Sequence, residues 1–310
     1  MEEGLLVCGN MNIDRIYSVP ELPMEGQSTP ISAERTVYGG CGGNIAIAAA
    51  RAGIPVLLSS VIGSDFPPKY RKNLLDAGVD LDFVRVSEME PSPYCLILSA
   101  PGGRQVYAFN FGSMKEQKQL EVPPGFFKYA HIATSDPSFS IRCARELSSR
   151  GSSVAIDPGM EIFFRWNREN LAEVLPYCHR FFGNLGEWKH LGEVLGWEGD
   201  VFSFLGNGVP FFEKAFEVID EAVITIGSSG SVIIDGEGIH HQCPVDVGEV
   251  VDATGAGDAF RGGFYGALMR EYSSRDALKF GNALGALSVK SGGPQDYEAD
   301  WEIIAKLIGK

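Results

Sequence analysis

DATGAGDAF, residues 252–260, places two carboxylates, two glycines and a threonine directly before a helical pattern. The preceding EVVD (249–252) predicts the end of a strand, and Thr254 predicts the N-cap of a helix that opens at Gly255. Glycine is conformationally costly at a helix start, which needs only a cap, so the glycines require a further explanation. One interpretation is a capped helix whose glycines allow close packing.

A second interpretation is an anion-binding site made of backbone N–H groups. Gly255, Ala256 and Gly257 have almost no side chain, so a ligand can approach their N–H groups at the positive end of the helix. Asp258 would lie in the first turn beside them, where its carboxylate could deprotonate a hydroxyl that attacks phosphorus. The stretch does not fit GxGxxG, because position 260 is Phe, and the chain contains no GxxxxGK[ST].

Short apolar runs alternate with helix-length periodic segments along the rest of the chain. The expected strands cover residues 5–9, 56–63, 129–134, 153–157, 180–184 and 222–227. The expected helices cover residues 44–52, 138–150, 185–195, 255–271 and 274–289. This alternation predicts an α/β fold, a mostly parallel sheet with helices on both faces, and we expect one domain over residues 1–310.

Two segments interrupt this alternation. Residues 15–38 are rich in turn residues, and residues 92–112 predict two strands joined by APGGR. We expect both segments in one small accessory β-sheet, which could act as a lid over a ligand site. A further hairpin is expected over residues 231–243, with its turn at 235–238.

Net charge and cysteine content narrow the function classes. The formal charge of −14 argues against nucleic-acid or membrane partners, because both reward a basic face. A phosphate ligand remains compatible, since a helix N-terminus binds anions even in an acidic protein. The six cysteines are scattered without a CxxC pair, and the N-terminal apolar run is too short for a signal peptide. We therefore expect reduced thiols in a cytoplasmic protein.

Polar residues in the N-terminal part predict a substrate site. GGCGGN (39–44) precedes a small-residue helix, and Asn44 offers a donor and an acceptor to hydroxyls. A tightly packed loop is the alternative for this segment. We expect VCGNMNIDRIY (7–17) to end the first strand with Asn12 and Asp14, which would then face the ligand crevice at the carboxyl ends of the strands.

GNLGEW (183–188) places Asn184 and Glu187 about one helical turn apart after another expected strand. The two side chains could organise a hydrated Mg²⁺ near phosphates. Plain helix capping is the alternative for this pair.

Taken in this order, these elements resemble the PfkB (ribokinase-like) family of carbohydrate and nucleoside kinases over essentially the whole chain. DATGAGDAFRGGF (252–264) is similar to the family's C-terminal signature, GGCGGN (39–44) to its N-terminal signature, and NLGE (184–187) to its N-x-x-E motif. The resemblance implies a ribokinase-like three-layer α/β/α fold with a small β-sheet lid. It also implies an ATP-dependent phosphotransferase that uses Mg²⁺.

The resemblance implies a role for each matching residue. Asp258 matches the catalytic base, and Gly255, Ala256 and Gly257 match the anion hole. The expected acceptor-binding residues are Asn12, Asp14, Gly40 and Asn44. The expected ATP-binding residues are Asn184, Thr225, Gly227, Ser228, Thr254 and Asn282. Glu187 and Asn184 match the Mg²⁺ pair, and Asp252 would lie beside a monovalent cation such as K⁺.

Shorter stretches resemble the archaeal nucleoside kinases of the family, namely HIATSDPSF (131–139), IDPG (156–159) and Arg261. This likeness implies that Asp136 faces the acceptor and that Phe109 or Phe111 covers its base. We therefore expect phosphorylation of the 5′-hydroxyl of a ribonucleoside such as cytidine, inosine, guanosine or adenosine. The alternatives are a ribokinase-type free-sugar kinase and a non-catalytic nucleoside-binding regulator. We also expect a homodimer through the lid, because exposed sheet edges tend to be covered.

Overall fold

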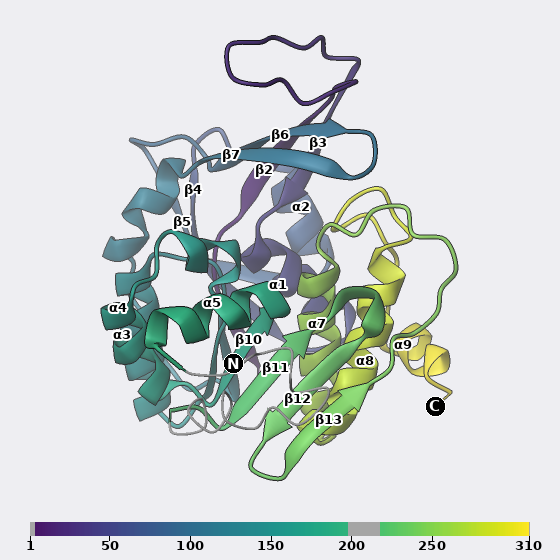
Figure 1. The fold of residues 1–310 in the computed structure, drawn as a ribbon. Helices are drawn as coiled ribbons and strands as arrows, with labels where there is room; N and C mark the ends of the chain where they lie inside the picture. Colours follow the sequence, from purple (N-terminus) through teal and green to yellow (C-terminus); the bar gives the residue numbers. More distant parts are fainter. Residues whose placement is uncertain (1–3, 198–217, 310) are drawn as a thin grey trace.

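The central feature of the computed structural model is a nine-stranded sheet between two layers of helices (Figure 1). The structure describes residues 4–197 and 218–309. The strand order is β13-β12-β11-β10-β9-β8-β1-β4-β5, and the strands run parallel except β12 and β13, which are antiparallel to their neighbours. The predicted α/β class with a mostly parallel sheet is therefore confirmed.

The strands of this sheet are β1 (Leu5–Cys8), β4 (Val56–Gly63), β5 (Val79–Ser87), β8 (Tyr129–Ile132), β9 (Ser153–Ile156), β10 (Arg180–Asn184), β11 (Glu221–Thr225), β12 (Ser231–Asp235) and β13 (Gly238–Gln242). The helices are α1 (Cys41–Arg51), α2 (Pro68–Asp76), α3 (Pro137–Ser149), α4 (Arg168–Val174), α5 (Leu185–Leu195), α7 (Ala256–Leu268), α8 (Ser274–Ser288) and α9 (Trp301–Leu307). The six strands expected over those ranges and all five predicted helices are present. The strand end predicted at EVVD (249–252) was wrong, because the N–H groups of Val251 and Asp252 donate to the Val289 carbonyl at the end of α8 and not to a neighbouring strand. The sequence did not predict β5, α2, α4 and α9, which are short, polar or at the edge of the fold.

Alternating side chains of the strands divide the core into two layers. In β1, Leu5 and Val7 pack with α1, α7 and α8, whereas Leu6 and Cys8 pack with α3 and α5 on the opposite face. All four side chains are buried, as expected for a central parallel strand with helices on both sides. The three-layer α/β/α arrangement is confirmed.

A four-stranded accessory sheet stands away from the main sheet (Figure 1). Its strands, in the order β3-β2-β6-β7, are β3 (Ala33–Gly39), β2 (Asn12–Ser18), β6 (Tyr94–Ala100) and β7 (Arg104–Asn110). Both predicted segments, 15–38 and 92–112, contribute strands to it. The predicted hairpin over 231–243 is also present, as β12 and β13.

The prediction that Asn12 and Asp14 end the first strand was wrong. The strand β1 ends at Cys8, and both residues belong to β2 of the accessory sheet. A Cβ at Gly9 would lie 2.8 Å from the Cα of Gly42, so the start of α1 packs directly on the chain after β1. This close approach turns the chain out of the main sheet.

None of the helices in the described residues is long and apolar enough to cross a membrane. All six cysteines are free thiols, as the sequence predicts.

The contact between α1 and α7 depends on Gly262. A Cβ at this position would lie 2.4 Å from the Cβ of Ala48 and 2.7 Å from the backbone nitrogen of Ala49. We expect Gly262→Ala to lower the free energy of unfolding by about 1–3 kcal/mol, because the helices must move apart. Urea denaturation measures this change. The control Gly236→Ala, where nothing lies within 4 Å of the added Cβ, should stay within about 0.5 kcal/mol of the wild type. Equal stability of the two variants would contradict this packing argument.

Candidate active site

A cavity of about 820 Å³ lies where β10 and β11 end and where α5 and α7 begin. This is the carboxyl edge of the parallel strands, the usual ligand position in such sheets. Its volume is within the range of small-molecule sites. The predicted site residues that line it are Asn184, Glu187, Thr225, Gly227, Ser228, Gly255, Ala256, Gly257, Asp258 and Asn282.

The start of α7 differs in detail from the prediction. Gly255, not Thr254, is the N-cap, with φ of 78°, and the helix begins at Ala256. The left-handed conformation favours glycine, and a Cβ at Gly255 would lie 2.4 Å from the Cβ of Pro294. The N-cap is therefore Gly255 and not the predicted Thr254, because the positive φ and the contact with Pro294 both favour glycine. Asp258 lies in the first turn, as predicted.

A chain of hydrogen bonds fixes the Asp258 carboxylate. Asn44 donates from Nδ2 to Asp258 Oδ2 at 2.8 Å, and Gln295 donates from Nε2 to Asn44 Oδ1 at 2.7 Å. Gln295 Nε2 also lies 2.9 Å from the Tyr70 hydroxyl, which donates to the Gly39 carbonyl at 2.7 Å. Asn44 therefore orients Asp258. The sequence did not reveal Gln295 or Tyr70, because no motif links them to residues so distant along the chain.

Burial and neighbouring charges set the pKa of Asp258. This pKa is raised to about 6, mainly by burial of the carboxyl group and to a smaller extent by the nearby Asp157 carboxylate. The Arg261 guanidinium and the Asn44 hydrogen bond act in the opposite direction. Such a carboxyl can both accept and release a proton near neutral pH.

Arg261 and Asp157 form a buried ion pair beside Asp258. Arg261 donates from Nε to Asp157 Oδ2 and from Nη1 to the Gly257 carbonyl at 2.9 Å. His131 Nε2 lies 3.4 Å from Asp157 Oδ2, and both Asp157 and Arg261 line the cavity. Burial alone would raise the pKa of Asp157, but Arg261 and His131 together lower it to about 2. Asp157 therefore stays ionised.

Asn184 and Glu187 form a capping box at the start of α5. Glu187 Oε2 accepts from the Asn184 N–H at 2.7 Å, and Asn184 Oδ1 accepts from the Glu187 N–H at 3.0 Å. The capping interpretation is thus confirmed, and the role with Mg²⁺ stays a prediction. Burial, together with Asp157, raises the pKa of Glu187 to about 7.

All the expected ATP-binding residues except Thr254 line the cavity. Thr225, Gly227 and Ser228 line the cavity after β11. Asn282 lines it from α8, and its Nδ2 donates to the carbonyls of Gln242 and Cys243 at 3.1 and 3.0 Å. This hydrogen bonding fixes the segment that follows β13.

The segment before Gly255 contacts the accessory sheet. Thr254 donates its N–H to Asp252 Oδ1 at 2.9 Å and does not line the cavity. Arg35 in β3 donates from Nη2 to Asp252 Oδ2, also at 2.9 Å. Both oxygens of Asp252 therefore already have donors.

The expected acceptor residues lie outside this cavity, where β2 and α1 begin. Asn12 donates from Nδ2 to Asp14 Oδ1 at 2.6 Å, and burial raises the pKa of Asp14 to about 6. Gly40 is the N-cap of α1 with φ of 92°, and a Cβ there would lie 2.8 Å from the Asn10 carbonyl. Asn44 joins this group to Asp258.

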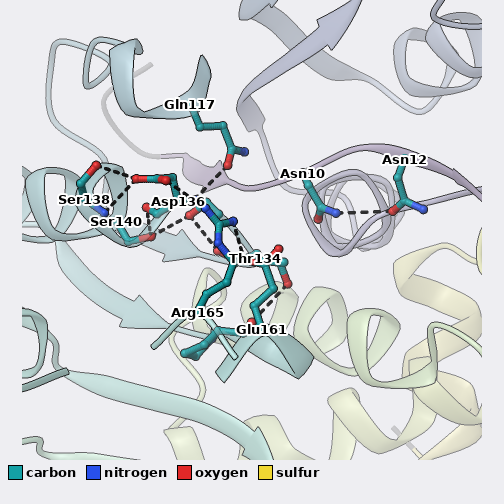
Figure 2. A network of polar contacts seen from close by, with 12 residues as sticks. Asn10, Asn12, Gln117, Thr134, Asp136, Ser138, Ser140, Glu161 and Arg165 are labelled. Atoms are coloured by element: carbon teal, nitrogen blue, oxygen red, sulfur yellow. Dashed lines mark hydrogen bonds and ion pairs between the residues drawn. The ribbon is translucent and has the colours of Figure 1, made fainter. Parts of the chain in front are cut away.

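Asp136 belongs to a separate polar network (Figure 2). It caps α3 by accepting from the Ser138 N–H at 3.0 Å, and it pairs with Arg165 at 2.9 Å. Arg165 also pairs with Glu161 at 2.9 Å, and burial raises the pKa of Glu161 to about 7. The Asp136 carboxylate is thus held by protein groups, and its contact with an acceptor stays a prediction.

Phe109 lies on β7 of the accessory sheet. Its ring meets Phe111 edge to face, with centroids 5.2 Å apart, and Arg165 lies 4.9 Å from the Phe111 centroid. The aromatic pair therefore connects the accessory sheet to the network of Asp136. Its contact with a base stays a prediction.

A small-molecule cavity at a helix N-terminus, with a half-buried carboxyl held by an amide, suits group transfer to a hydroxyl. The comparisons agree with this class. The chain belongs to the pfkB family of carbohydrate kinases, whose family model matches residues 2–301. It is a phosphotransferase that acts on a hydroxyl group.

Three relatives cover nearly the whole chain. A nucleoside kinase of Methanocaldococcus jannaschii is 28% identical over 99% of this chain and 97% of its own length. A nucleoside kinase of Methanothermobacter thermautotrophicus is 29% identical over 95% and 92%. A ribokinase of Haemophilus influenzae is 28% identical over 95% of each chain. The crystal structure of the M. jannaschii nucleoside kinase superposes with a TM-score of 0.89, covering 99% of this chain and 98% of that one.

Four carboxyls with raised pKa values predict how stability depends on pH. The pKa values of Asp14 and Asp258 are about 6, and those of Glu161 and Glu187 about 7. Unfolded carboxyls titrate near pH ~4, so these four groups bind protons more tightly in the folded protein. His131 acts in the opposite direction, because burial lowers its pKa. Four groups outweigh one, and we expect the free energy of unfolding to fall as the pH rises from 5 to 7.5.

Urea denaturation at pH 5, 6, 7 and 7.5 measures this dependence. Asp258→Asn removes one of the four titrating groups, so its pH dependence should be shallower than that of the wild type. Stability that rises over this interval, or an unchanged slope in the variant, would show that these carboxyls titrate normally.

Proposed function

We propose that this phosphotransferase transfers the γ-phosphoryl group of ATP to the 5′-hydroxyl of a ribonucleoside. The observation that carries the proposal is the position of Asp258. Its carboxyl is half-buried, faces the cavity beside the start of α7, and accepts a hydrogen bond from Asn44, which lies at the start of α1. The two nucleoside kinase relatives support the acceptor class.

Asp258 is the proposed base. It accepts the proton of the acceptor hydroxyl while that oxygen forms a bond to the γ-phosphorus. The bond from phosphorus to the β,γ-bridging oxygen breaks, and ADP leaves with that oxygen. The N–H groups of Gly255, Ala256 and Gly257 stabilise the negative charge on the transferring group.

The acceptor would lie between Asp258 and the accessory sheet, which acts as a lid. Asp14, with Asn12 and Asn44, would bind the ribose hydroxyls, because carboxylate and amide oxygens accept hydrogen bonds from a diol. Asp136 and Phe109, which are connected through Arg165 and Phe111, would contact the base. Closure of the lid would exclude water from the reacting atoms.

The residues around the cavity fit a nucleotide with Mg²⁺. Thr225, Gly227, Ser228 and Asn282 would bind the nucleotide, and Glu187 with Asn184 would face its phosphates. Among residues 4–197 and 218–309, no three His, Cys, Asp or Glu side chains form a metal site. Mg²⁺ would therefore be held mainly by phosphates and water, as it commonly is, and would supply positive charge at the phosphates.

A monovalent cation fits less well at Asp252. Both carboxylate oxygens already accept hydrogen bonds, one from Thr254 and one from the Arg35 guanidinium. Arg35 already places a positive charge beside Asp252, so no step of the mechanism is assigned to K⁺.

The homodimer through the lid and the cytoplasmic location belong to the same proposal. Val106 and Tyr107 are about half exposed on β7, an edge strand of the accessory sheet. Exposed apolar groups on an edge strand favour a covering partner. ATP as a substrate and six free thiols support the location.

A ribokinase-type free-sugar kinase is the second candidate, favoured by the H. influenzae relative. Product formation from ATP–Mg²⁺ with cytidine, uridine, adenosine, inosine, guanosine, ribose and fructose 6-phosphate separates the two. Turnover of ribose with no nucleoside product would replace the proposal with the sugar kinase. A nucleoside-binding regulator would bind a nucleoside with no turnover of ATP.

Removing the base tests the mechanism. We expect Asp258→Asn to lower kcat on the order of 10²–10⁴-fold, the usual contribution of a positioned base. The amide keeps the size of the side chain, so the affinity for ATP, measured by calorimetry, should be nearly unchanged. A variant with full activity would exclude Asp258 as the base.

Substituting Asp14 tests whether the acceptor binds beside this residue. We expect Asp14→Ala to raise KM for the acceptor at least tenfold, because the hydroxyls lose a charged partner, while KM for ATP changes less than threefold. Steady-state kinetics with each substrate varied in turn measures both constants. An equal effect on the two substrates would remove Asp14 from the acceptor site.

A further inference from the structure

Arg261 is a buried cation that the proposed mechanism leaves without a chemical role. Arg261 is only 5% exposed to solvent, yet it lines the cavity. Among the described residues that line the cavity, Arg261 is the one Arg, Lys or His, whereas Asp157, Glu187, Asp246 and Asp258 contribute four carboxyls. A polyphosphate that enters this cavity would therefore meet one positively charged side chain.

The geometry of α7 aims this charge at the proposed anion hole. Arg261 follows Asp258 by three residues, so the two side chains share one face of the helix. Helical side chains lean toward the N-terminus, and Nη1 of Arg261 reaches back to the Gly257 carbonyl at 2.9 Å. A Cβ at Gly257 would lie 2.9 Å from Nη1. Glycine at 257 thus leaves room for the guanidinium beside the N–H groups of the first turn.

Two of the three guanidinium nitrogens are already used. Nε donates to Asp157 and Nη1 to Gly257, whereas Nη2 has no hydrogen-bond partner in the described part of the chain. Asp157 and the Gly257 carbonyl hold the planar group in one orientation. A fixed guanidinium with a remaining N–H pair in a phosphate-sized cavity is suited to an oxyanion.

We propose that Arg261 is a catalytic residue that donates from Nη2 to an oxygen of the transferring phosphoryl group, with Asp157 as its positioning residue. The acceptor proton goes to Asp258, the acceptor oxygen bonds to phosphorus as the bond to ADP breaks, and Arg261 keeps all its protons. The guanidinium supplies positive charge where charge develops, as a lysine does in P-loop enzymes. The inference rests on the proposed γ-phosphoryl transfer, but it does not depend on which hydroxyl accepts the group.

A structural ion pair is the competing explanation, and Arg180 provides a matched control. Arg180 is 3% exposed and donates from Nε to Glu221 at 2.8 Å and from Nη1 to Ser153 at 3.2 Å. It begins β10, whereas Asn184 ends the same strand at the cavity, which places the two about 13 Å apart. Removing Arg180 breaks an equally buried pair without touching the cavity.

The test compares Arg261→Gln with Arg180→Gln, using the acceptor that the wild type turns over best. We expect Arg261→Gln to lower kcat on the order of 10²–10³-fold, as for the loss of one oxyanion donor, with a change in the dissociation constant of ADP below threefold. Arg180→Gln should lower stability and leave kcat within threefold. Equal loss of kcat in both variants, or an unchanged kcat in Arg261→Gln, would overturn the proposal.

Chemical rescue separates a catalytic contact from a folding defect. In Arg261→Ala, guanidinium chloride at millimolar concentration should raise kcat at least tenfold. In Asp258→Asn, the same addition should leave kcat unchanged. Failure of rescue in a folded Arg261→Ala variant would assign Arg261 to structure alone.

A transition-state mimic gives a readout that needs no acceptor. Wild-type protein should bind ADP with Mg²⁺ and aluminium fluoride at least tenfold more tightly than ADP with Mg²⁺, and Arg261→Gln should lose this difference. A retained difference would overturn the proposal. If ribose alone is turned over, the nucleoside assignment fails while these tests of Arg261 still apply.

Discussion

Arg261 and Asp157 bring opposite charges together beneath the first turn of α7, in a cavity that also holds the carboxyls of Asp258 and Glu187. Asp157 and Glu187 are buried and Asp258 is half-buried. Without a cation these three carboxylates would repel one another and any phosphate, and desolvation would favour their protonated forms. The guanidinium changes this balance. Asp157 stays ionised with a pKa of about 2, whereas Asp258 and Glu187 titrate near neutrality. One ion pair therefore gives three neighbouring acids different protonation states, which a single kind of burial could not do.

At three glycines of the site, neighbouring groups lie so close that a side chain would not fit. A Cβ at Gly255 would lie 2.4 Å from the Cβ of Pro294, and a Cβ at Gly257 would lie 2.9 Å from Nη1 of Arg261. At the start of α1, the backbone of residues 10–12 fills the same space at Gly40. Close packing and ligand access were competing interpretations of the sequence, but the two are compatible here. Tight packing of the backbone brings the N–H groups of α7 to the cavity wall, where an anion can reach them.

Local patterns in the sequence predicted most of the fold and about half of the candidate site. The alternation of apolar runs predicted the sheet, and DATGAGDAF predicted a helix whose first turn carries Asp258 at a cavity. The cap at Gly255 was missed in part because the contact that excludes a Cβ there comes from Pro294, 39 residues farther along the chain. Gln295 and Tyr70 were missed for a related reason. Their roles arise from hydrogen bonds between residues 225 positions apart, and no local spacing encodes such a contact.

The hydrogen bonds from Asp258 through Asn44, Gln295 and Tyr70 end at Gly39, the last residue of β3. Asn44 Nδ2 donates to Asp258 and Asn44 Oδ1 accepts from Gln295. Rotating the Asp258 carboxylate away would therefore break its hydrogen bond to an amide that is itself fixed. The carboxylate is thus oriented before a substrate enters, and its orientation is linked to the base of the accessory sheet. Arg35 gives the same strand a second attachment, at Asp252. The proposed catalytic groups therefore lie on α7, whereas the residues proposed to bind the acceptor lie on β2 and at the start of α1. Because these are different segments, acceptor preference can change without altering α7, which agrees with a family that contains both nucleoside kinases and ribokinases.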